Sequence, residues 1–183
     1  ALHVHIADVS YYVRPGSPID REALLRGTSV YFPDRAVPML PVELSTDQCS
    51  LRPHEDRLVM SALLEIDNHG DVVAQDFTRG VIRSAERMTY TAVHKVLEGD
   101  LDARERYASL VTRFEQMREL ALLLNRKRQR RGSIDFDLPE PLLEFDEFGE
   151  MTGVTRAPRN IAHRIIEEFM LAANEAVAAH LEA

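Results

Sequence analysis

Two patterns of apolar residues divide this chain into predicted strands and predicted helices. Residues 2–13 alternate loosely between apolar and polar side chains, which predicts a strand followed by a turn. Residues 58–66 and 71–84 read as two paired strands, and Asn68-His69-Gly70 between them predicts a hairpin turn. Residues 133–158 are expected to form strand and loop.

Two long helices are predicted in the second half of the chain. Over residues 105–131, apolar side chains recur at steps of three and four residues, which is the spacing of one helical face. These side chains are Tyr107, Leu110, Val111, Phe114, Met117, Ala121 and Leu124. Gly132 is expected to end that helix. A second long helix is predicted over residues 160–181, and a shorter one over residues 89–98.

The first third of the chain holds a short predicted helix and a long loop. Asp20 is expected to be the N-cap of a helix that runs through Arg26 and stops at Gly27. Residues 28–53 then contain four prolines, and proline at that density excludes a continuous helix or a central strand. Long ordered loops are often functional, so this segment is a candidate binding surface.

These elements predict one α+β unit without a linker, in which a mixed or antiparallel sheet packs with long helices. A chain of 183 residues with 45% apolar side chains is long enough to bury a core, and no apolar run approaches the roughly 18 residues of a membrane span. The net charge of −8 argues against tight nonspecific nucleic-acid binding by the whole surface, but it leaves room for a local basic channel. Cys49 is the only cysteine, so a reducing, cytoplasmic location is expected.

His3 and His5 raise the hypothesis of a metal site. Residues i and i+2 of a strand share one face, so an H-x-H sequence places two imidazoles side by side, as in some metal-dependent hydrolases. No Cys/His pattern typical of a zinc site accompanies them, and short H-x-H matches are common by chance. A metal-dependent hydrolase that uses His3 and His5 is therefore an alternative, which metal analysis of the purified chain would test.

Five stretches resemble, in the same order, the RNB domain, which is the catalytic domain of the ribonuclease II and ribonuclease R exoribonucleases. The most informative is RGTSVYFPDRAVPMLPVELS at residues 26–45. The others are HIADVSYYV, CSLRPHEDRL, RRGSIDFDLPE and IAHRIIEEFMLAANEAVAAHL, and together the five span nearly the whole chain. The resemblance implies a partial RNB catalytic domain within a processive 3′→5′ exoribonuclease that hydrolyses single-stranded RNA to nucleoside 5′-monophosphates.

Two aromatic residues are implied to hold the RNA bases. In the family, the tyrosine that matches Tyr31 stacks on a nucleotide near the 3′ end and helps to set the length of the final product. The phenylalanine that matches Phe136 clamps the terminal bases from the opposite side. Base–aromatic stacking contributes roughly 1–3 kcal/mol per base without sequence preference. From the residues alone, Tyr31 and Phe32 could instead fill the core beneath the loop, and Phe136 could be an ordinary apolar strand residue.

Polar residues on the last predicted helix are the next candidates. On this mostly apolar helix, four polar residues lie close to one stripe, namely Arg159, His163, Glu167 and Asn174. The resemblance implies that Glu167 lies near the 3′-terminal nucleotide and helps to select RNA, and that Tyr90 takes part in the same selection. A carboxylate can accept a hydrogen bond from the ribose 2′-OH, which DNA lacks. For any one of the stripe residues alone, a solvated stripe is the simpler interpretation.

A run of basic residues lies at the C-terminal end of the helix predicted over residues 105–131. It consists of Arg126, Lys127, Arg128, Arg130 and Arg131. Cations favour helix C-termini, which explains part of the run. Five positive charges within six residues exceed what capping needs, so phosphate contacts by Arg126, Arg128, Arg130 and Arg131 are an equal alternative.

The catalytic metal site of the family is expected outside this chain. RNB enzymes bind Mg²⁺ with closely spaced aspartates, which are expected just upstream of residues 2–13. A catalytic arginine is expected downstream, and cold-shock and S1 barrels are expected to flank the domain. Asp8, Asp135 and Asp137 are not expected to replace the aspartate cluster. The chain is therefore expected to bind RNA within a monomeric enzyme, to hold no metal itself and to be inactive alone. A catalytically dead RNA-binding module of the same family is the alternative.

Overall fold

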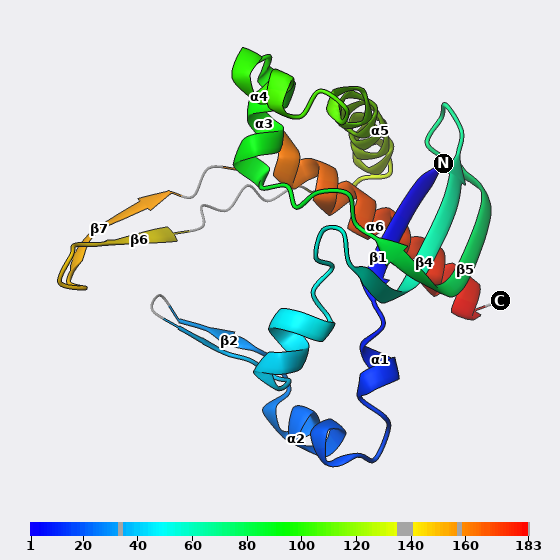
Figure 1. Cartoon of the computed structure of the whole chain (residues 1–183). Helices are drawn as coiled ribbons and strands as arrows, with labels where there is room; N and C mark the ends of the chain where they lie inside the picture. Colours follow the sequence, from blue (N-terminus) through cyan, green and yellow to red (C-terminus); the bar gives the residue numbers. More distant parts are fainter. Residues whose placement is uncertain (33–34, 135–140, 157–158, 183) are drawn as a thin grey trace. The chain divides into compact units, whose positions relative to one another are not determined.

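A three-stranded sheet with the strand order β1-β4-β5 joins segments that are far apart in the sequence (Figure 1). Its strands are β1 (Leu2–Ala7), β4 (Asp56–Ile66) and β5 (Val72–Arg83). The computed structural model describes residues 1–32, 35–134, 141–156 and 159–182. Together with the helices described below, this sheet confirms the predicted α+β fold class.

The turn between β4 and β5 lies where the sequence predicts it. Asp67 Oδ1 accepts hydrogen bonds from the backbone N–H groups of His69 and Asp71, at 2.8 and 2.9 Å. Gly70 has a φ of 84°, a left-handed conformation that glycine adopts without the steric cost of a Cβ. The hairpin is therefore specified locally, by one acceptor side chain and one glycine.

The first strand is shorter than predicted. β1 ends at Ala7, and the short helix α1 (Val9–Tyr12) follows it. Asp8 caps this helix, because its Oδ1 accepts hydrogen bonds from the Tyr11 N–H at 3.2 Å and from the Ser10 hydroxyl at 2.5 Å. The prediction of a strand up to residue 13 is therefore wrong after Ala7, since the capping carboxylate stabilises a helical turn there.

Helix α2 (Pro18–Arg26) begins earlier than predicted. Its N-cap is Ser17, whose hydroxyl accepts a hydrogen bond from the Asp20 N–H at 3.2 Å, so the assignment of Asp20 as the N-cap is wrong. Asp20 instead accepts a hydrogen bond at 2.8 Å from the N–H of Gly16, the residue before the N-cap. Gly27 ends the helix, as predicted.

The proline-rich stretch contains only short elements in its described part. Strands β2 (Val30–Tyr31) and β3 (Ala36–Val37) pair antiparallel, and η1 (Leu44–Gln48) is a single π-helical turn. Neither a continuous helix nor a central strand occurs among the described residues of this stretch, as the prolines predict.

From residue 88 onwards, the described residues form four helices and a hairpin. The helices are α3 (Tyr90–Glu98), α4 (Leu101–Arg106), α5 (Val111–Arg130) and α6 (Ile161–Glu182). The strands β6 (Pro141–Phe145) and β7 (Met151–Arg156) pair antiparallel. Helices α3 and α6 agree with their predicted ranges. Phe136, Asp135 and Asp137 lie outside the described residues.

The helix predicted over residues 105–131 is confirmed over residues 111–130, but its predicted start is wrong, because residues 107–110 form a turn between α4 and α5. Asp100 caps α4 by accepting a hydrogen bond from the Ala103 N–H at 2.8 Å. The Arg104 guanidinium donates to the Val96 carbonyl at 3.2 Å and to Glu115 at 2.9 Å, so it holds α4 against its neighbours. Because α3 packs on α4, α5 and α6, tertiary contacts override the continuous helical pattern.

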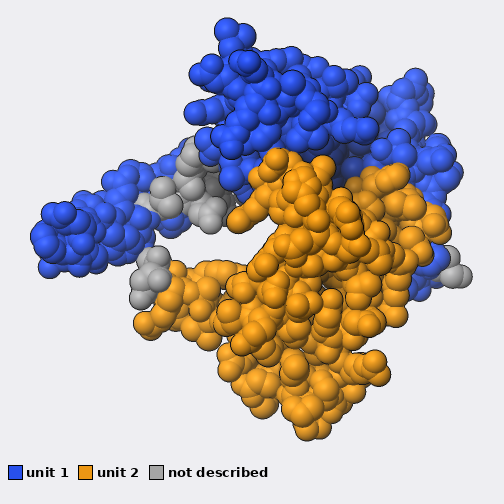
Figure 2. All heavy atoms as spheres, viewed as in Figure 1, with its two compact units in different colours: residues 1–2, 64–75, 88–183 blue, residues 3–63, 76–87 orange. Residues whose placement is uncertain are grey.

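The chain divides into two compact units, each with its own buried residues (Figure 2). Unit 1 comprises residues 1–2, 64–75 and 88–183, and unit 2 comprises residues 3–63 and 76–87. The buried apolar side chains of unit 1 include Leu64, Val96, Phe114, Ala121, Ile165 and Phe169, and those of unit 2 include Ala23, Val59 and Ala62. No helix among the described residues is both long enough and apolar enough to cross a membrane.

Candidate nucleic-acid interface

Tyr90 and His163 stack on each other where α3 and α6 pack together within unit 1. Tyr90 is the first residue of α3, which begins there because the Thr89 hydroxyl accepts a hydrogen bond from the Ala92 N–H at 3.2 Å. The ring centroids of Tyr90 and His163 lie 4.0 Å apart, and the ring planes are inclined by 22°. Tyr90 remains 46% exposed, so part of its ring is accessible to a ligand.

Glu167 lies one helical turn beyond His163 on α6, so the two side chains share one side of the helix. The Arg159 Nη2 donates a hydrogen bond to Glu167 Oε2 at 2.7 Å, and the Arg128 Nη2 lies 3.9 Å from Glu167 Oε1. The Glu167 side chain is 39% exposed. Oε1 therefore retains room to accept a hydrogen bond from a ligand, beside the stacked rings.

Glu168, which was not among the predicted site residues, is the buried carboxylate of this region. Its side chain is 5% exposed, and its Oε1 accepts hydrogen bonds from Arg128 Nη2 at 2.7 Å and from Asn125 Nδ2 at 2.8 Å. The sequence did contain a signal, because Glu168 follows Ile165 by three residues and precedes Phe169 on the apolar face of the helix. A carboxylate on a buried face requires a cationic partner, which the basic run provides.

Two further cations of the basic run also pair with carboxylates. The Lys127 Nζ lies 2.7 Å from Asp71 Oδ1 and donates to the Gly70 carbonyl at 2.8 Å. The Arg131 Nη2 donates to Glu175 Oε1 at 2.5 Å. This hydrogen bond, together with the charges of the nearby cations, holds the pKa of the Glu175 carboxyl below its usual range.

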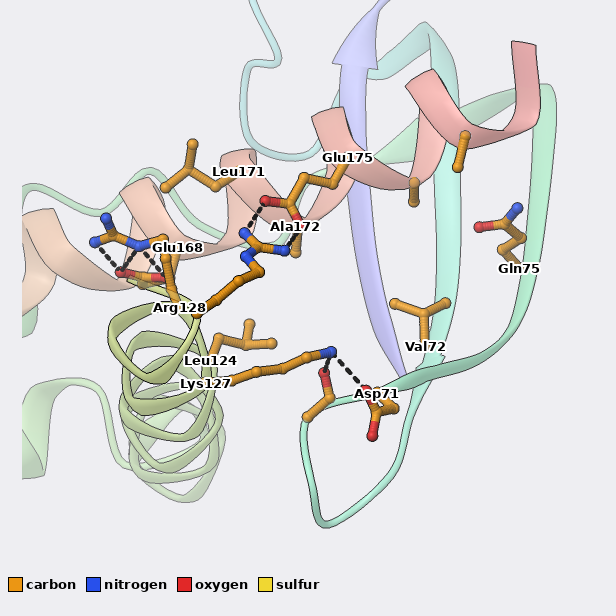
Figure 3. Close-up of a pocket in the computed structure, with 14 residues that line it drawn as sticks. Asp71, Val72, Gln75, Leu124, Lys127, Arg128, Glu168, Leu171, Ala172 and Glu175 are labelled. Carbon is orange, nitrogen blue, oxygen red and sulfur yellow. Dashed lines mark hydrogen bonds and ion pairs between the residues drawn. The ribbon is translucent and has the colours of Figure 1, made fainter. Parts of the chain in front are cut away.

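The three ion pairs surround a hollow of about 370 Å³ between α5, α6 and the β4–β5 turn (Figure 3). Apolar side chains such as Val72, Leu124 and Ala172 line the remainder of it. Each of the three cations in this hollow has a carboxylate partner, namely Asp71, Glu168 or Glu175. The hollow is therefore balanced in charge and does not resemble a basic channel for phosphate.

The four arginines predicted to contact phosphate fall into two groups. Arg128 and Arg131 are engaged by the carboxylates of α6. Arg126 and Arg130 are exposed, and neither forms an ion pair within the part of the chain that the structure describes. The Arg130 Nε approaches the Arg126 carbonyl at 3.4 Å. Of these four arginines, Arg126 and Arg130 are thus the two whose guanidinium groups can contact phosphate without breaking an ion pair among the described residues.

Tyr31 lies in unit 2, on the β2–β3 hairpin. It pairs with Ala36 across the hairpin and is 80% exposed, so it does not fill the core of that unit. The neighbouring Phe32 lies beneath the Arg35 guanidinium, 5.4 Å from the centroid of the ring. An exposed tyrosine on a short paired segment can present a ring face to a base.

His3 and His5 have no third ligand within the described part of the chain. Their ring centroids lie 6.0 Å apart in an edge-to-face arrangement, and His5 Nδ1 is 2.7 Å from the Ser61 hydroxyl. Burial and the neighbouring His3 lower the pKa of the His5 imidazole. Over residues 1–32, 35–134, 141–156 and 159–182, no group of three or more His, Cys, Asp or Glu side chains is arranged to hold a metal ion.

Comparison with known proteins identifies the family of this chain. The RNB domain model matches residues 1–183. A ribonuclease R of Aquifex aeolicus is 49% identical over 181 residues, which cover 99% of this chain and 26% of that protein. This chain therefore spans about a quarter of the length of that relative.

Solved structures agree with this match. RNase R of Mycoplasma genitalium has been solved in complex with ribose-methylated single-stranded RNA and in complex with double-stranded RNA. Each of the two is 33% identical to this chain, with a TM-score of 0.90 over 98% of it and over 28% and 32% of the respective solved chains. From its full-length match to the domain model and its identity to ribonuclease R, the chain belongs to the RNB domain family.

Proposed function

We propose that this chain is part of the catalytic domain of a processive 3′→5′ exoribonuclease, which hydrolyses single-stranded RNA to nucleoside 5′-monophosphates. Membership of the RNB domain family supports this proposal, as does the similarity to proteins named ribonuclease R. Within that enzyme, the role of this chain is to hold the 3′ end of the RNA and to recognise its sugar.

The cluster of Tyr90, His163 and Glu167 is the observation that carries the proposal. It combines an accessible aromatic ring with a carboxylate oxygen that has room for a ligand, one helical turn apart. A ribose 2′-OH donates a hydrogen bond to Glu167 Oε1, while Tyr90 packs against the sugar. DNA lacks that hydroxyl, so the carboxylate would lose its partner.

Base stacking is assigned to Tyr31 and Phe136. The exposure of Tyr31 supports its part, because a stacking platform must be open on one face. The assignment of Phe136 rests on the family resemblance alone. Sequence-tolerant stacking suits an enzyme that must accept every base in turn.

Phosphate contact is assigned to Arg126 and Arg130, whose exposed guanidinium groups extend from the C-terminal turn of α5. Their contribution should depend on salt, because binding of phosphate releases condensed counterions from the nucleic acid. Arg128 and Arg131 are excluded from this assignment, since phosphate binding would break their ion pairs with Glu168 and Glu175.

The described residues do not fit the Mg²⁺ that the family implies. Asp8 caps α1 and lies 3.5 Å from the Arg79 Nε, and no other described carboxylate completes a metal site with it. No step of the hydrolysis is therefore assigned to residues of this chain. We assign the metal ligands to the aspartate cluster expected upstream in the complete protein.

Cleavage of a 5′-labelled oligoribonucleotide with Mg²⁺ tests the proposal in two arms. The complete protein should yield a ladder of shortened products that EDTA abolishes, and the 183-residue chain alone should yield none. RNA binding without cleavage by the complete protein would instead support a catalytically dead binding module. Cleavage by the isolated chain, with a bound metal that depends on His3 and His5, would support the metal-dependent hydrolase.

A further inference from the structure

We propose that Arg128 is a positioning residue, which orients the Glu167 carboxylate for the ribose. This inference rests on the proposed function of Glu167. It adds a residue that does not touch RNA but controls the geometry of one that does.

The Arg128 guanidinium contacts several described side chains of α6 and of the residues that follow α5. Its Nη2 and Nε donate to the buried Glu168 at 2.7 and 3.2 Å, which anchors the group on α6. The same Nη2 lies 3.9 Å from Glu167 Oε1. Its Nη1 donates to the Ser133 hydroxyl at 3.3 Å, and Ser133 precedes Phe136 by three residues. One rigid planar group is therefore hydrogen-bonded to Glu168 and Ser133 and lies 3.9 Å from the adjacent Glu167 carboxylate.

Glu167 is held from two sides. Arg159, which precedes α6, binds Oε2 at 2.7 Å, whereas Arg128 reaches towards Oε1 from α5. Without Arg128, Arg159 would be the one cation that orients the Glu167 side chain within the described part of the chain, and Oε1 would lose the positive charge that Arg128 places beside it. The oxygen assigned to the 2′-OH is thus the one whose position depends on Arg128.

Burial distinguishes this pair from an ordinary surface ion pair. The side chain of Arg128 is 15% exposed and that of Glu168 is 5% exposed, and Asn125 also donates to Glu168. The Arg131–Glu175 pair joins the same two helices, but both of its side chains are more than half exposed, and it lies about two turns of α6 away from Glu167. That pair supplies a matched control.

Arginine is required for this role because lysine lacks the geometry. The guanidinium presents five N–H donors in a fixed plane, whereas an ammonium group is a single point of charge. Arg128→Lys can keep a charge beside Glu168 and preserve the packing of the helices. It cannot hold Glu168, Glu167 and Ser133 simultaneously.

The test compares four variants of the complete protein: Arg128→Lys, the double variant Arg128→Gln with Glu168→Gln, Glu167→Ala, and the control Glu175→Gln. The double variant removes both buried charges together, so it leaves no unpaired carboxylate in the interior. The measured quantity is the ratio of cleavage rates for an all-ribose oligomer and for oligomers with one deoxy sugar near the 3′ end.

We expect both Arg128 variants to lower this ratio by roughly tenfold, the size of a typical coupling between contacting residues. The ratio for Glu175→Gln should equal that of the wild type. If both Arg128 variants keep the wild-type ratio, or slow all substrates equally, while Glu167→Ala lowers the ratio, then the role of Arg128 is refuted and ribose reading by Glu167 stands. If Glu167→Ala also leaves the ratio unchanged, the ribose-reading proposal fails as well.

Discussion

The two candidate RNA-contacting regions are stabilised in different ways. In unit 1, Glu167 and Tyr90 are held by other side chains: a stacked histidine, a salt bridge from Arg159 and the buried Arg128–Glu168 pair. In unit 2, Tyr31 is 80% exposed, and the described contacts of its short strand are backbone pairings with residues 36–37. In unit 1, a network of side-chain contacts fixes Glu167 and Tyr90. In unit 2, a short hairpin presents Tyr31 to solvent.

The difference matches the two kinds of recognition proposed. A hydrogen bond to a single hydroxyl weakens steeply with distance and angle, so its acceptor must be fixed closely. Stacking on an aromatic face tolerates any base and a range of offsets. We therefore expect mutations around Glu167 to affect both stability and discrimination, and mutations of Tyr31 to affect only how the RNA end is held.

The largest effect is expected for Glu168→Ala. Removing this carboxylate leaves the buried Arg128 without its main partner, and loss of one member of a buried pair costs about 3–5 kcal/mol. Amide hydrogen exchange of α5 and α6 in the complete protein measures the loss as faster local opening. Tyr31→Ala is the control, with an expected change within about 0.5 kcal/mol because its side chain is exposed. Equal protection of α5 and α6 in both variants would contradict the contrast between the regions.

A second, smaller effect is expected for Glu167→Ala in the choice between RNA and DNA. A hydrogen bond to a charged acceptor contributes roughly 1.5–3 kcal/mol, or about tenfold to a hundredfold in discrimination. Cleavage of RNA should fall, while binding of DNA should be unchanged or improved, because a carboxylate without a partner has been removed. The measurement uses matched oligomers with one deoxy sugar at successive positions from the 3′ end. Equal discrimination by wild type and variant at every position would assign Glu167 a structural role instead.

Tyr31→Ala should change the size of the final product more than the overall affinity for RNA. One lost stack costs about 1–3 kcal/mol, whereas phosphate contacts elsewhere keep the strand bound. The end products formed from poly(A) by the complete protein are to be compared with those of the wild type, alongside binding at the same salt concentration. An unchanged product length would show that Tyr31 is not a base platform.

The smallest effect is expected for Glu175→Gln, and it should depend on pH. The hydrogen bond from Arg131 lowers the pKa of Glu175 in the folded state, so its stabilising contribution is complete above the ordinary glutamate pKa of about 4.3. That contribution is lost as the pH falls through the folded-state value. The difference in melting temperature between wild type and variant should therefore be largest at neutral pH and should shrink below about pH 4. Because the pair is exposed, the difference should also shrink at high salt.

Much of the fold follows from local sequence. The β4–β5 turn carries a local signal in Gly70 and the residues before it, and α6 carries one in its long apolar face, so both were predicted where they occur. The errors arose where one capping side chain, or packing between residues far apart in the sequence, determines the local backbone structure. Asp8 caps α1 and so ends the predicted strand at Ala7, and the helix predicted from residue 105 begins only at Val111, after the turn that separates it from α4.

The candidate site likewise combines residues that the sequence named with contacts that the sequence could not predict. The residue types and the family resemblance named Tyr90, Glu167 and the basic run as candidates, whereas Glu168, which lies on the apolar face of α6, was not among them. Only the tertiary structure could show that His163 stacks on Tyr90, that Arg128 binds Glu168, and that Arg126 and Arg130 form no such pair among the described residues. These contacts join residues 40 or more positions apart, which helical periodicity cannot relate because it connects only neighbours on one element.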